Sequence, residues 1–484
     1  MDEYKIKALS EFKWQVEKNE TAGMRVPGII FSDRDLLEHA KVENTISQVT
    51  NVATLPGIIK ASYAMPDIHF GYGFPIGGVA AFDPDKGGII SPGGVGFDIS
   101  CGVRALRSDF ELDDIKGSIE DMISFISSSV PRGLGGKGSI NLSKKDMGKL
   151  LSGGVDWAVK NGYGFDEDKK FIEDGGRIKE AEPGYVSETA FKRGKGQLGS
   201  LGSGNHFLEF QVVDEIYEGR AADTFGLFKD QIIIMLHSGS RGLGHQVCSD
   251  YIKVMQKASE KYRIKVPDRQ LASAPLISPE GRRYYGAMAC AANYAMANRQ
   301  CLSYVVRQAM ESYMGSSAEK LGLFTIYDIS HNIARWEEHD LGDGIRKVCV
   351  HRKGATRAFG PGREEVPDEY RHIGQPVIIP GDMGTYSFIL AGTDTAMKES
   401  FGSSCHGAGR IMSRSRAKRT INGYQLKHNL KNQKGIIVIA DSMLALAEEA
   451  PQAYKNINTI VEISSGAGLS KKVARLRPLG VIKG

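Results

Sequence analysis

The expected helices and strands of this chain follow one another in no regular order. Apolar residues at helical spacing cover positions 34–50, 112–129, 283–315 and 443–463, the last interrupted by Pro451. Short apolar runs typical of strands cover positions 78–82, 207–213, 232–236, 348–350, 376–379 and 436–439. The sequence has no βαβαβ alternation, no repeat and no long flexible linker. Residues with distinctive chemistry come from positions 98 to 483. We therefore expect an α+β fold with mixed β-sheets, in which residues 1–484 form a single large intertwined domain, although the length alone would suggest two or three domains.

The composition indicates a site built largely from loops. Glycine accounts for 58 of 484 residues, and the glycines cluster beside His, Asn, Asp and Ser rather than in linkers. Glycine lets backbone amides approach a ligand closely. Hydrophobic residues make up 41% and charged residues 25%, which is typical of a soluble globular protein, and a net charge of +5 does not by itself indicate a nucleic-acid partner.

Targeting signals are not evident. The first residues are acidic and polar, unlike a signal peptide, and no apolar run is long enough to cross a bilayer, so a cytoplasmic protein without a membrane partner is expected. The six cysteines are scattered without a disulfide framework, and in a reducing compartment each is a buried thiol or a metal ligand.

Histidines in polar, glycine-rich contexts suggest a metal site. His237 follows the apolar run 232–236, and His206 and His331 lie in polar segments. Asp98 and Cys101 are three residues apart in a glycine-rich loop, so both can reach one ion. Thiolate, imidazole and carboxylate together bind Zn²⁺, Mn²⁺ or Co²⁺, and paired ions serve phosphoryl transfer. The alternative for any single one of these residues is a hydrogen-bonded structural histidine or a small buried thiol.

A second segment indicates nucleotide chemistry. His406 lies among glycines and is followed by Arg410, Arg414 and Arg416, which suits a nucleophilic imidazole beside a phosphate clamp. The alternative is a basic helix start after a glycine turn. Lys353 is followed by Gly and Ala instead of the Lys-x-Asp-Gly motif of lysine-dependent ligases, so we interpret it as a phosphate-binding cation. The apolar residues before the C-terminus suggest that the tail docks onto the protein.

Six segments together resemble the RtcB family of RNA ligases, over positions from about 24 to the last residue: 65–69, 94–102, 204–209, 237–242, 351–355 and 406–409. The resemblance implies an RtcB-like fold and a GTP-dependent enzyme with two Mn²⁺ ions. Asp98, Cys101 and His206 would bind one ion, and Cys101, His237 and His331 the other. His406 would form a covalent bond to GMP, which would then pass to an RNA 3′-phosphate before the 5′-hydroxyl of a second strand attacks.

The resemblance also implies a set of residues around the nucleotide. Glu209 and Lys483 suit the edge of guanine, because a carboxylate accepts from its N–H groups and an ammonium donates to its carbonyl. The full implied set is Asn205, His206, Phe207, Leu208, Glu209, His331, Asn332, Pro380, Gly381, Asp382, Met383, Ser387, His406, Gly407, Ala408, Gly409, Tyr454 and Lys483.

One departure from the family pattern is visible, since Asp382 replaces a serine and would repel a phosphate unless it is turned away. His69 and His351 match family motifs without belonging to the implied metal set, and we expect them to support ligands or substrate. Candidates for the RNA path are Arg241, Lys353, Arg357, Arg410 and Arg414.

Other functions and partners stay open at this point. A dinuclear metallophosphoesterase would use the same metals without GTP, and a noncatalytic RNA-binding relative would have lost ligands that are present here. The family makes an archease-type activating partner plausible, and either tRNA splicing or RNA repair fits.

Overall fold

Two large β-sheets form the centre of the protein. The structure, a computed structural model, describes residues 4–133 and 135–484. Among these residues the first sheet has seven strands in the order β1-β2-β3-β4-β5-β13-β12. Only the β3–β4 pair in it is parallel. Its strands are β1 (Ile6–Ser10), β2 (Lys13–Val16), β3 (Gly28–Phe31), β4 (Ile58–His69), β5 (Ile76–Phe82), β13 (Ile345–Lys353) and β12 (Asn332–Asp340).

The second sheet has the order β11-β7-β9-β8-β19-β16-β15, and β18 pairs in parallel with β19. Its strands are β11 (Thr325–Ser330), β7 (Gly102–Glu111), β9 (Gln231–Ser238), β8 (Phe207–Ile216), β19 (Ser470–Lys483), β16 (Ser387–Gly392), β15 (Pro376–Ile379) and β18 (Ile437–Ala440). Two short pairs complete the strands, β6 (Ile89–Ile90) with β10 (Ala274–Pro275), and β14 (Ala355–Arg357) with β17 (Ser403–Cys405). Mixed sheets alongside many helices confirm the expected α+β class.

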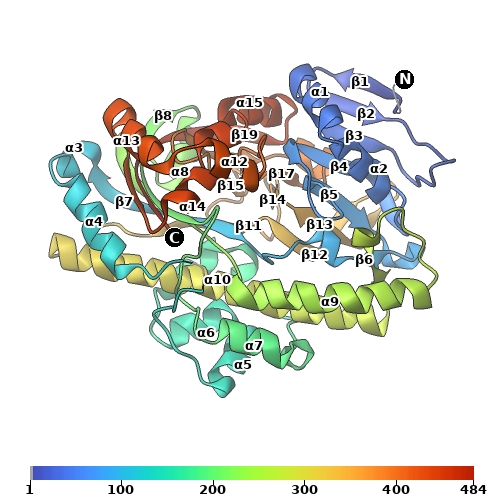
Figure 1. The fold of residues 1–484 in the computed structure, drawn as a ribbon, viewed down its shortest axis with the longest axis horizontal. Coiled ribbons are helices and arrows are strands. Elements are labelled where there is room, and N and C mark those ends of the chain that lie inside the picture. Colours follow the sequence, from blue (N-terminus) through green and yellow to red (C-terminus); the bar gives the residue numbers. More distant parts are fainter. Residues whose placement is uncertain (1–3, 134) are drawn as a thin grey trace.

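Two long helices, α9 and α10, run side by side beneath the sheets, and α5, α6 and α7 lie below them (Figure 1). Ser278 caps the N-terminus of α10, Pro279 opens the helix, and Gly315 ends it in a left-handed conformation. The helices are α1 (Arg34–Val42), α2 (Thr45–Val52), α3 (Leu112–Ile115), α4 (Ile119–Ser129), α5 (Lys144–Gly153), α6 (Val155–Lys160), α7 (Glu188–Gly194), α8 (Gly219–Phe225), α9 (Arg241–Lys261), α10 (Pro279–Met314), α11 (Asp394–Glu399), α12 (Arg414–Thr420), α13 (Gly423–Lys434), α14 (Met443–Glu448) and α15 (Ile457–Gly466). Within the described residues, none of them is long and apolar enough to cross a membrane.

The expected helices differ from the observed ones mainly where the backbone turns. The pattern at 34–50 is two helices, because Asn44 adopts a left-handed conformation between α1 and α2. The pattern at 112–129 is also divided, into α3 and α4. At 443–463, Pro451 opens a 3₁₀ turn (Pro451–Ala453), and α15 begins only at Ile457. The tail docks as expected, as the last residues of the fourteen-residue strand β19.

The register of the second sheet brings four chain segments to one end. His237 near the end of β9 pairs with Val103 near the start of β7 and with Phe207 at the start of β8. Ser330, the last residue of β11, pairs with Gly102, the first residue of β7. Since these pairs are antiparallel, strand starts and strand ends meet at the same edge. The residues just outside the strands, Cys101, His206 and His331, therefore gather around His237.

Candidate active site

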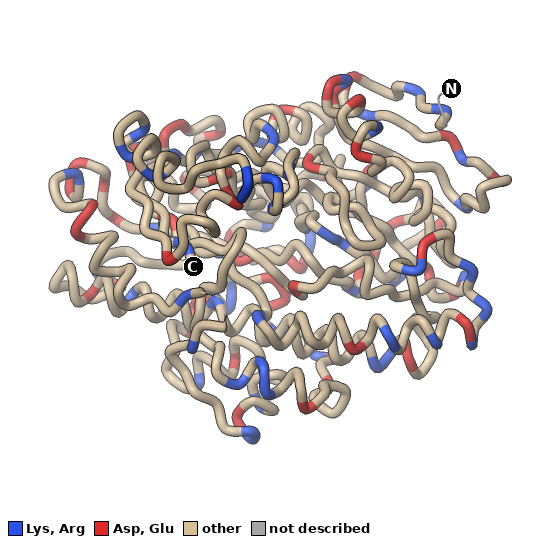
Figure 2. Tube along the Cα trace, in the orientation of Figure 1, with Lys and Arg blue, Asp and Glu red and all other residues tan. Residues whose placement is uncertain are grey.

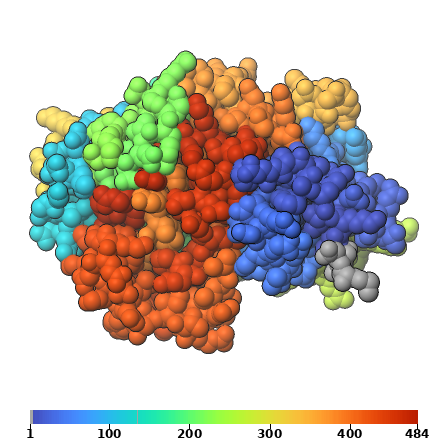
Figure 3. Space-filling model, turned by 90° about the horizontal axis from the view of Figure 1, so that it is seen from above, coloured from blue at the N-terminus to red at the C-terminus, as the bar shows by residue number. Residues whose placement is uncertain are grey.

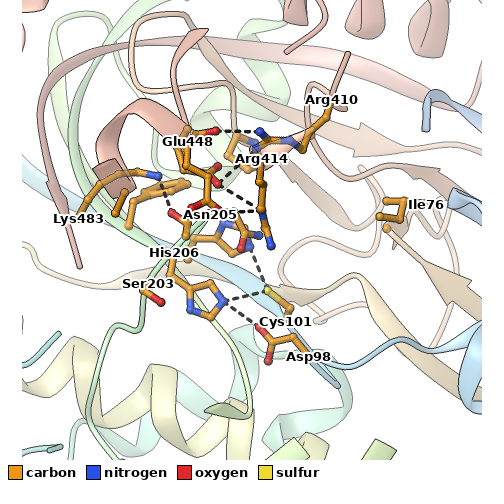
Figure 4. Close-up of a pocket in the computed structure, with 18 of the residues that line it drawn as sticks. Ile76, Asp98, Cys101, Ser203, Asn205, His206, Arg410, Arg414, Glu448 and Lys483 are labelled. Atoms are coloured by element: carbon orange, nitrogen blue, oxygen red, sulfur yellow. Dashed lines mark hydrogen bonds and ion pairs between the residues drawn. The ribbon is translucent and has the colours of Figure 1, made fainter. Parts of the chain in front are cut away.

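The five residues predicted to bind metal meet at this edge of the sheet. Ligand atoms of Asp98, Cys101 and His206 lie within 4.8 Å of one another, and so do those of Cys101, His237 and His331. Sγ of Cys101 is 3.4 Å from Nε2 of His206 and 3.3 Å from Nε2 of His237. Figure 4 shows Asp98, Cys101 and His206 turned toward one another. Cys101 belongs to both groups.

Burial fixes the charge state of the donors. Desolvation by burial holds the pKa values of His237 and His331 well below the ordinary value, which favours neutral imidazoles. Burial opposes ionisation of Asp98, but its hydrogen bond to His206 outweighs this and lowers the pKa of Asp98 to about 2. Burial and the charge of Asp98 raise the pKa of Cys101. Nε2 of His237 and Nε2 of His331 face each other at 3.2 Å. Converging neutral imidazoles, a carboxylate and a thiol form a donor set that fits divalent transition metals.

We call Asp98, Cys101, His206, His237 and His331 the donor cluster. A buried arginine on α10 supports its backbone. Arg299 donates from Nη1 to the carbonyl oxygens of Ser100, at 2.8 Å, and Ser238, at 3.1 Å. Its Nη2 donates to Oδ1 of Asp328 at 2.7 Å. Ser100 and Ser238 are the chain neighbours of Cys101 and His237, so one guanidinium holds two of the segments that carry donors. Sequence reasoning missed Arg299, because its place in a helical pattern carries no sign of this role.

His406 follows β17 and is oriented by a buried carboxylate. Oδ2 of Asp67 lies 2.5 Å from Nδ1 of His406 and accepts hydrogen bonds from the backbone N–H groups of His406, at 3.0 Å, and Gly407, at 3.3 Å. Asp67 lies on β4, which contacts β17, and Figure 3 shows N-terminal and C-terminal segments of the chain side by side. Because Asp67 occupies Nδ1, Nε2 is the ring nitrogen left for chemistry. Burial opposes ionisation of Asp67, but the interactions with His406 lower its pKa.

Asp67 is the main residue of this site that sequence reasoning missed. The segment 65–69 belongs to the motifs that resemble the family, but nothing in the local sequence marks the role of its carboxylate. His69 beside it lines the cavity, with Nδ1 placed 3.0 Å from the carbonyl oxygen of Asp67, and burial lowers the pKa of His69 to about 3. His351 is completely buried and does not line the cavity.

A cavity of about 1580 Å³ joins His406, the donor cluster and the predicted nucleotide residues. In Figure 4, Lys483 and Ile76 lie on opposite sides of it, with Cys101 and Asp98 between them toward the bottom. All the predicted nucleotide residues line the cavity except Leu208 and Ser387. The side chain of Leu208 points into the hydrophobic core on the other face of β8, because side chains alternate along a strand. Ser387 instead accepts hydrogen bonds from Gln211 and from the backbone of Gly381.

The Lys483 side of the cavity has a buried acid and a buried base. Oε2 of Glu209 accepts from Gln211 at 2.6 Å, while Oε1 has no hydrogen-bond partner among the described residues. Burial raises the pKa of Glu209 to about 8. Lys483 donates to the carbonyl oxygen of Gly204 at 2.9 Å, and burial lowers the pKa of its ammonium. A free buried carboxyl oxygen beside an ammonium is available to a ligand with both donors and acceptors on one edge.

Asp382 is turned toward its own loop. Its Oδ1 accepts from the backbone N–H of Gly384 at 2.8 Å, and its Oδ2 accepts from the hydroxyl of Thr385 at 2.8 Å. Burial raises the pKa of Asp382. Both oxygens of Asp382 are therefore occupied within the turn.

The predicted cations divide into two groups. Arg241, Lys353, Arg410 and Arg414 line the cavity. The prediction for Arg357 is wrong: it is buried, forms an ion pair with Asp174 at 3.0 Å, and does not line the cavity. Lys353 is also buried, its Nζ donates to the carbonyl oxygen of Phe74 at 3.2 Å, and burial lowers its pKa to about 7.

A buried donor cluster and a carboxylate-oriented histidine that share one cavity are the features of an enzyme rather than of a binding module. Comparison with known proteins identifies the group. The family model described as tRNA-splicing ligase RtcB matches residues 48–484. Proteins named tRNA-splicing ligase RtcB from Archaeoglobus fulgidus and Methanococcus maripaludis are each 51% identical to this chain, and one from Thermococcus kodakarensis is 50% identical. Each alignment spans 479 residues and covers 99% of both chains. The chain belongs to the RtcB family of RNA ligases.

Proposed function

We propose that the protein joins an RNA 3′-phosphate or 2′,3′-cyclic phosphate end to a 5′-hydroxyl end, using GTP and Mn²⁺, and that tRNA halves are among its substrates. The observation that carries this proposal is the arrangement of His406. Its Nδ1 is held by Asp67, and it shares one cavity with the donor cluster and with Glu209. The names of the relatives support tRNA splicing as the physiological task.

His406 is the proposed nucleophile. Its Nε2 attacks the α-phosphorus of GTP, a nitrogen–phosphorus bond forms, and pyrophosphate leaves. Asp67 stabilises the positive charge that develops on the ring and keeps Nε2 unprotonated for the attack. The ring centroids of His406 and His331 are 5.0 Å apart, so the proposed nucleophile lies beside the donor cluster.

Guanine is the proposed base of the nucleotide. The free oxygen Oε1 of Glu209 can accept from its N–H groups, and Lys483 can donate to its carbonyl oxygen. Adenine presents an acceptor and an amino group at the corresponding positions, so it would leave both buried side chains unpaired.

Two Mn²⁺ ions are the proposed metals, one held by Asp98, Cys101 and His206 and the other by Cys101, His237 and His331. When bound, they supply positive charge against the phosphate groups. The RNA chemistry then has three steps. A cyclic phosphate, where present, is hydrolysed to a 3′-phosphate. An oxygen of this phosphate attacks the phosphorus on His406 and takes up GMP, which frees the imidazole. The 5′-hydroxyl then attacks the activated phosphate, loses its proton, and GMP leaves as the strands join.

The charge distribution supports an RNA path over α12 and α13. Positions 400–440 contain no Asp or Glu, and Arg and Lys recur along them. These helices lie at the upper left of Figure 2, where blue segments gather. Arg416, Arg419 and Lys427 are exposed there. Arg410 and Arg414 line the adjoining cavity, where they form ion pairs with Glu449. We also infer that residues 1–484 act as one catalytic domain, since the cavity draws residues from position 43 to position 484.

The test of this function is a ligation assay with purified protein, Mn²⁺, GTP and two RNA strands, one ending in a 3′-phosphate and the other beginning with a 5′-hydroxyl. We expect a joined product that requires GTP and both end groups. Release of inorganic phosphate from the 3′ end without joining, and without a need for GTP, would instead identify a metallophosphoesterase. Ligation with ATP in place of GTP would contradict the proposed role of Glu209.

A further inference from the structure

Four of the aromatic side chains that line the cavity are Phe70, Tyr72, Phe97 and His245, which we call the aromatic wall. The rings of Tyr72 and Phe97 are 5.5 Å apart edge to face, and those of Phe97 and His245 are 5.1 Å apart. Phe97 is the chain neighbour of Asp98, so the wall continues directly into the donor cluster. The proposed reaction gives the aromatic wall no role.

Phe70 is the exposed member of the wall. Its side chain is 58% accessible, and among the exposed large hydrophobic residues of the described chain it alone lines the cavity. Exposure of an apolar ring to water is unfavourable, so a ligand that covers Phe70 would gain binding free energy.

The loop that carries Phe70 and Tyr72 is held rigidly. It joins β4 to β5 and ends next to Ile76, which lies across the cavity from Lys483 in Figure 4. Gln48, which is buried, donates to the carbonyl oxygen of Gly71 at 2.6 Å and accepts from the backbone N–H of Gly71 at 3.0 Å.

The other end of the loop is held in the same way. Gln270 accepts from the backbone N–H of Gly73 at 2.8 Å, and Lys353 donates to the carbonyl oxygens of Tyr72 and Phe74. An exposed ring on a loop fixed from three sides is a preorganised surface, since its ordering cost is met before a ligand arrives.

The surroundings of the wall define the ligand. Arg241 opens the helix that carries His245, and burial, together with the nearby charge of Arg193, lowers the pKa of His245. Arg193 and Arg241 also line the cavity. Flat apolar faces beside guanidinium groups match a nucleotide, whose base stacks on a ring while its phosphate pairs with an arginine.

We infer that the aromatic wall stacks the base of the RNA nucleotide next to the join and so places the reacting end at the donor cluster. This inference rests on the proposed function and adds a site for the base. Stacking is tolerant of base identity, because every base has a flat face, so the wall positions an end without reading its sequence. The same chemistry could serve the last nucleotide of the 3′-phosphate strand or the first nucleotide of the 5′-hydroxyl strand.

The experiment places 2-aminopurine, a base whose fluorescence is quenched by stacking, at one or the other of these two nucleotides. The wild-type protein should quench one of the two labelled strands on binding. Phe70→Leu, at an exposed position that does not determine folding, should lose much of this quenching, and Phe97→Leu should lose more. Phe228→Leu is the matched control, because Phe228 is also an exposed phenylalanine, 38% accessible, but lies outside the cavity. It should quench as the wild type does.

A second readout separates stacking from a general structural effect. Removing the base of the identified nucleotide should raise the KM for that strand about tenfold in the wild type. For the Phe70→Leu variant, removal of the base should raise the KM much less, because the stacking interaction is already lost. An equal increase in KM for the abasic strand in both proteins, or quenching of neither labelled strand, would overturn the proposed stacking role of the aromatic wall. Failure of the wild-type protein to become labelled by GTP in the absence of RNA would instead overturn the proposed function.

Discussion

Asp67 and His406 are 339 positions apart in the chain, yet Oδ2 of Asp67 accepts a hydrogen bond from the backbone of His406 and lies 2.5 Å from its Nδ1. The carboxylate fixes both the ring orientation and the protonated nitrogen of the proposed nucleophile. Asp67→Asn should therefore lower the rate of covalent labelling by GTP by about a hundredfold or more, because an amide can stabilise the wrong tautomer and does not stabilise the charged ring. The measurement is single-turnover labelling with α-labelled GTP. Labelling at the wild-type rate would show that Asp67 only caps the turn.

Arg299 should act on metal affinity. Arg299→Met removes the donors to the carbonyl oxygens of Ser100 and Ser238, so affinity for Mn²⁺ should fall about 10- to 100-fold in a calorimetric titration. The matched control is Arg307→Met. Arg307 is also buried on α10 and forms an ion pair with Asp168 at 2.7 Å, but its partners Asp168, Leu323 and Thr325 are not chain neighbours of the metal-ligand candidates.

Both arginine variants should lose about 3–5 kcal/mol of stability, since each leaves a buried carboxylate with fewer partners. Only Arg299→Met should lose metal affinity beyond this shared effect. Equal affinity for Mn²⁺ in the two variants would mean that Arg299 has only a structural role.

Glu209 should determine the choice of nucleotide. In Glu209→Gln, the side chain keeps its size but an NH₂ donor replaces one of its two oxygens, so an acceptor for the N–H groups of guanine is lost and the KM for GTP should rise about tenfold or more. The preference for GTP over ITP, which lacks the amino group of guanine, should shrink in the same variant. An unchanged GTP/ITP ratio of kcat/KM would mean that the base is bound elsewhere.

Glu209 should also make the ligand-free protein sensitive to pH. Its pKa is raised by burial from 4.5 to about 8, so the folded protein keeps a proton that the unfolded chain loses above about pH 4.5. The contribution of Glu209 to stability is therefore present at low pH and lost as the pH rises toward 8. In Glu209→Gln, the free energy of unfolding should fall less between about pH 5 and pH 8. The exposed Glu38→Gln is the control and should follow the wild-type profile.

Much of this site could be predicted from local sequence. Cys101 and His237 stand out because a glycine-rich loop and an apolar run precede them, and such junctions between strand and loop are common positions for ligands. The mixed-sheet class also followed from the irregular order of the elements.

The remaining residues depend on long-range packing, which no local pattern reveals. Asp67 gains its role only because β4 packs against the segment after β17. Lys483 reaches the cavity because β19 pairs with both β8 and β18. The sequence did not predict this strand, because it contains Pro478 and proline is rare inside sheets. A shift in register between Pro478 and Gly480 accommodates it.

The most direct test of the central claim is mass spectrometry of the protein after incubation with GTP and Mn²⁺ in the absence of RNA. The account predicts a GMP adduct on the peptide that contains His406, and none on the His406→Ala protein. An adduct on Lys353 or on any other residue, or an adduct that persists in His406→Ala, would contradict it.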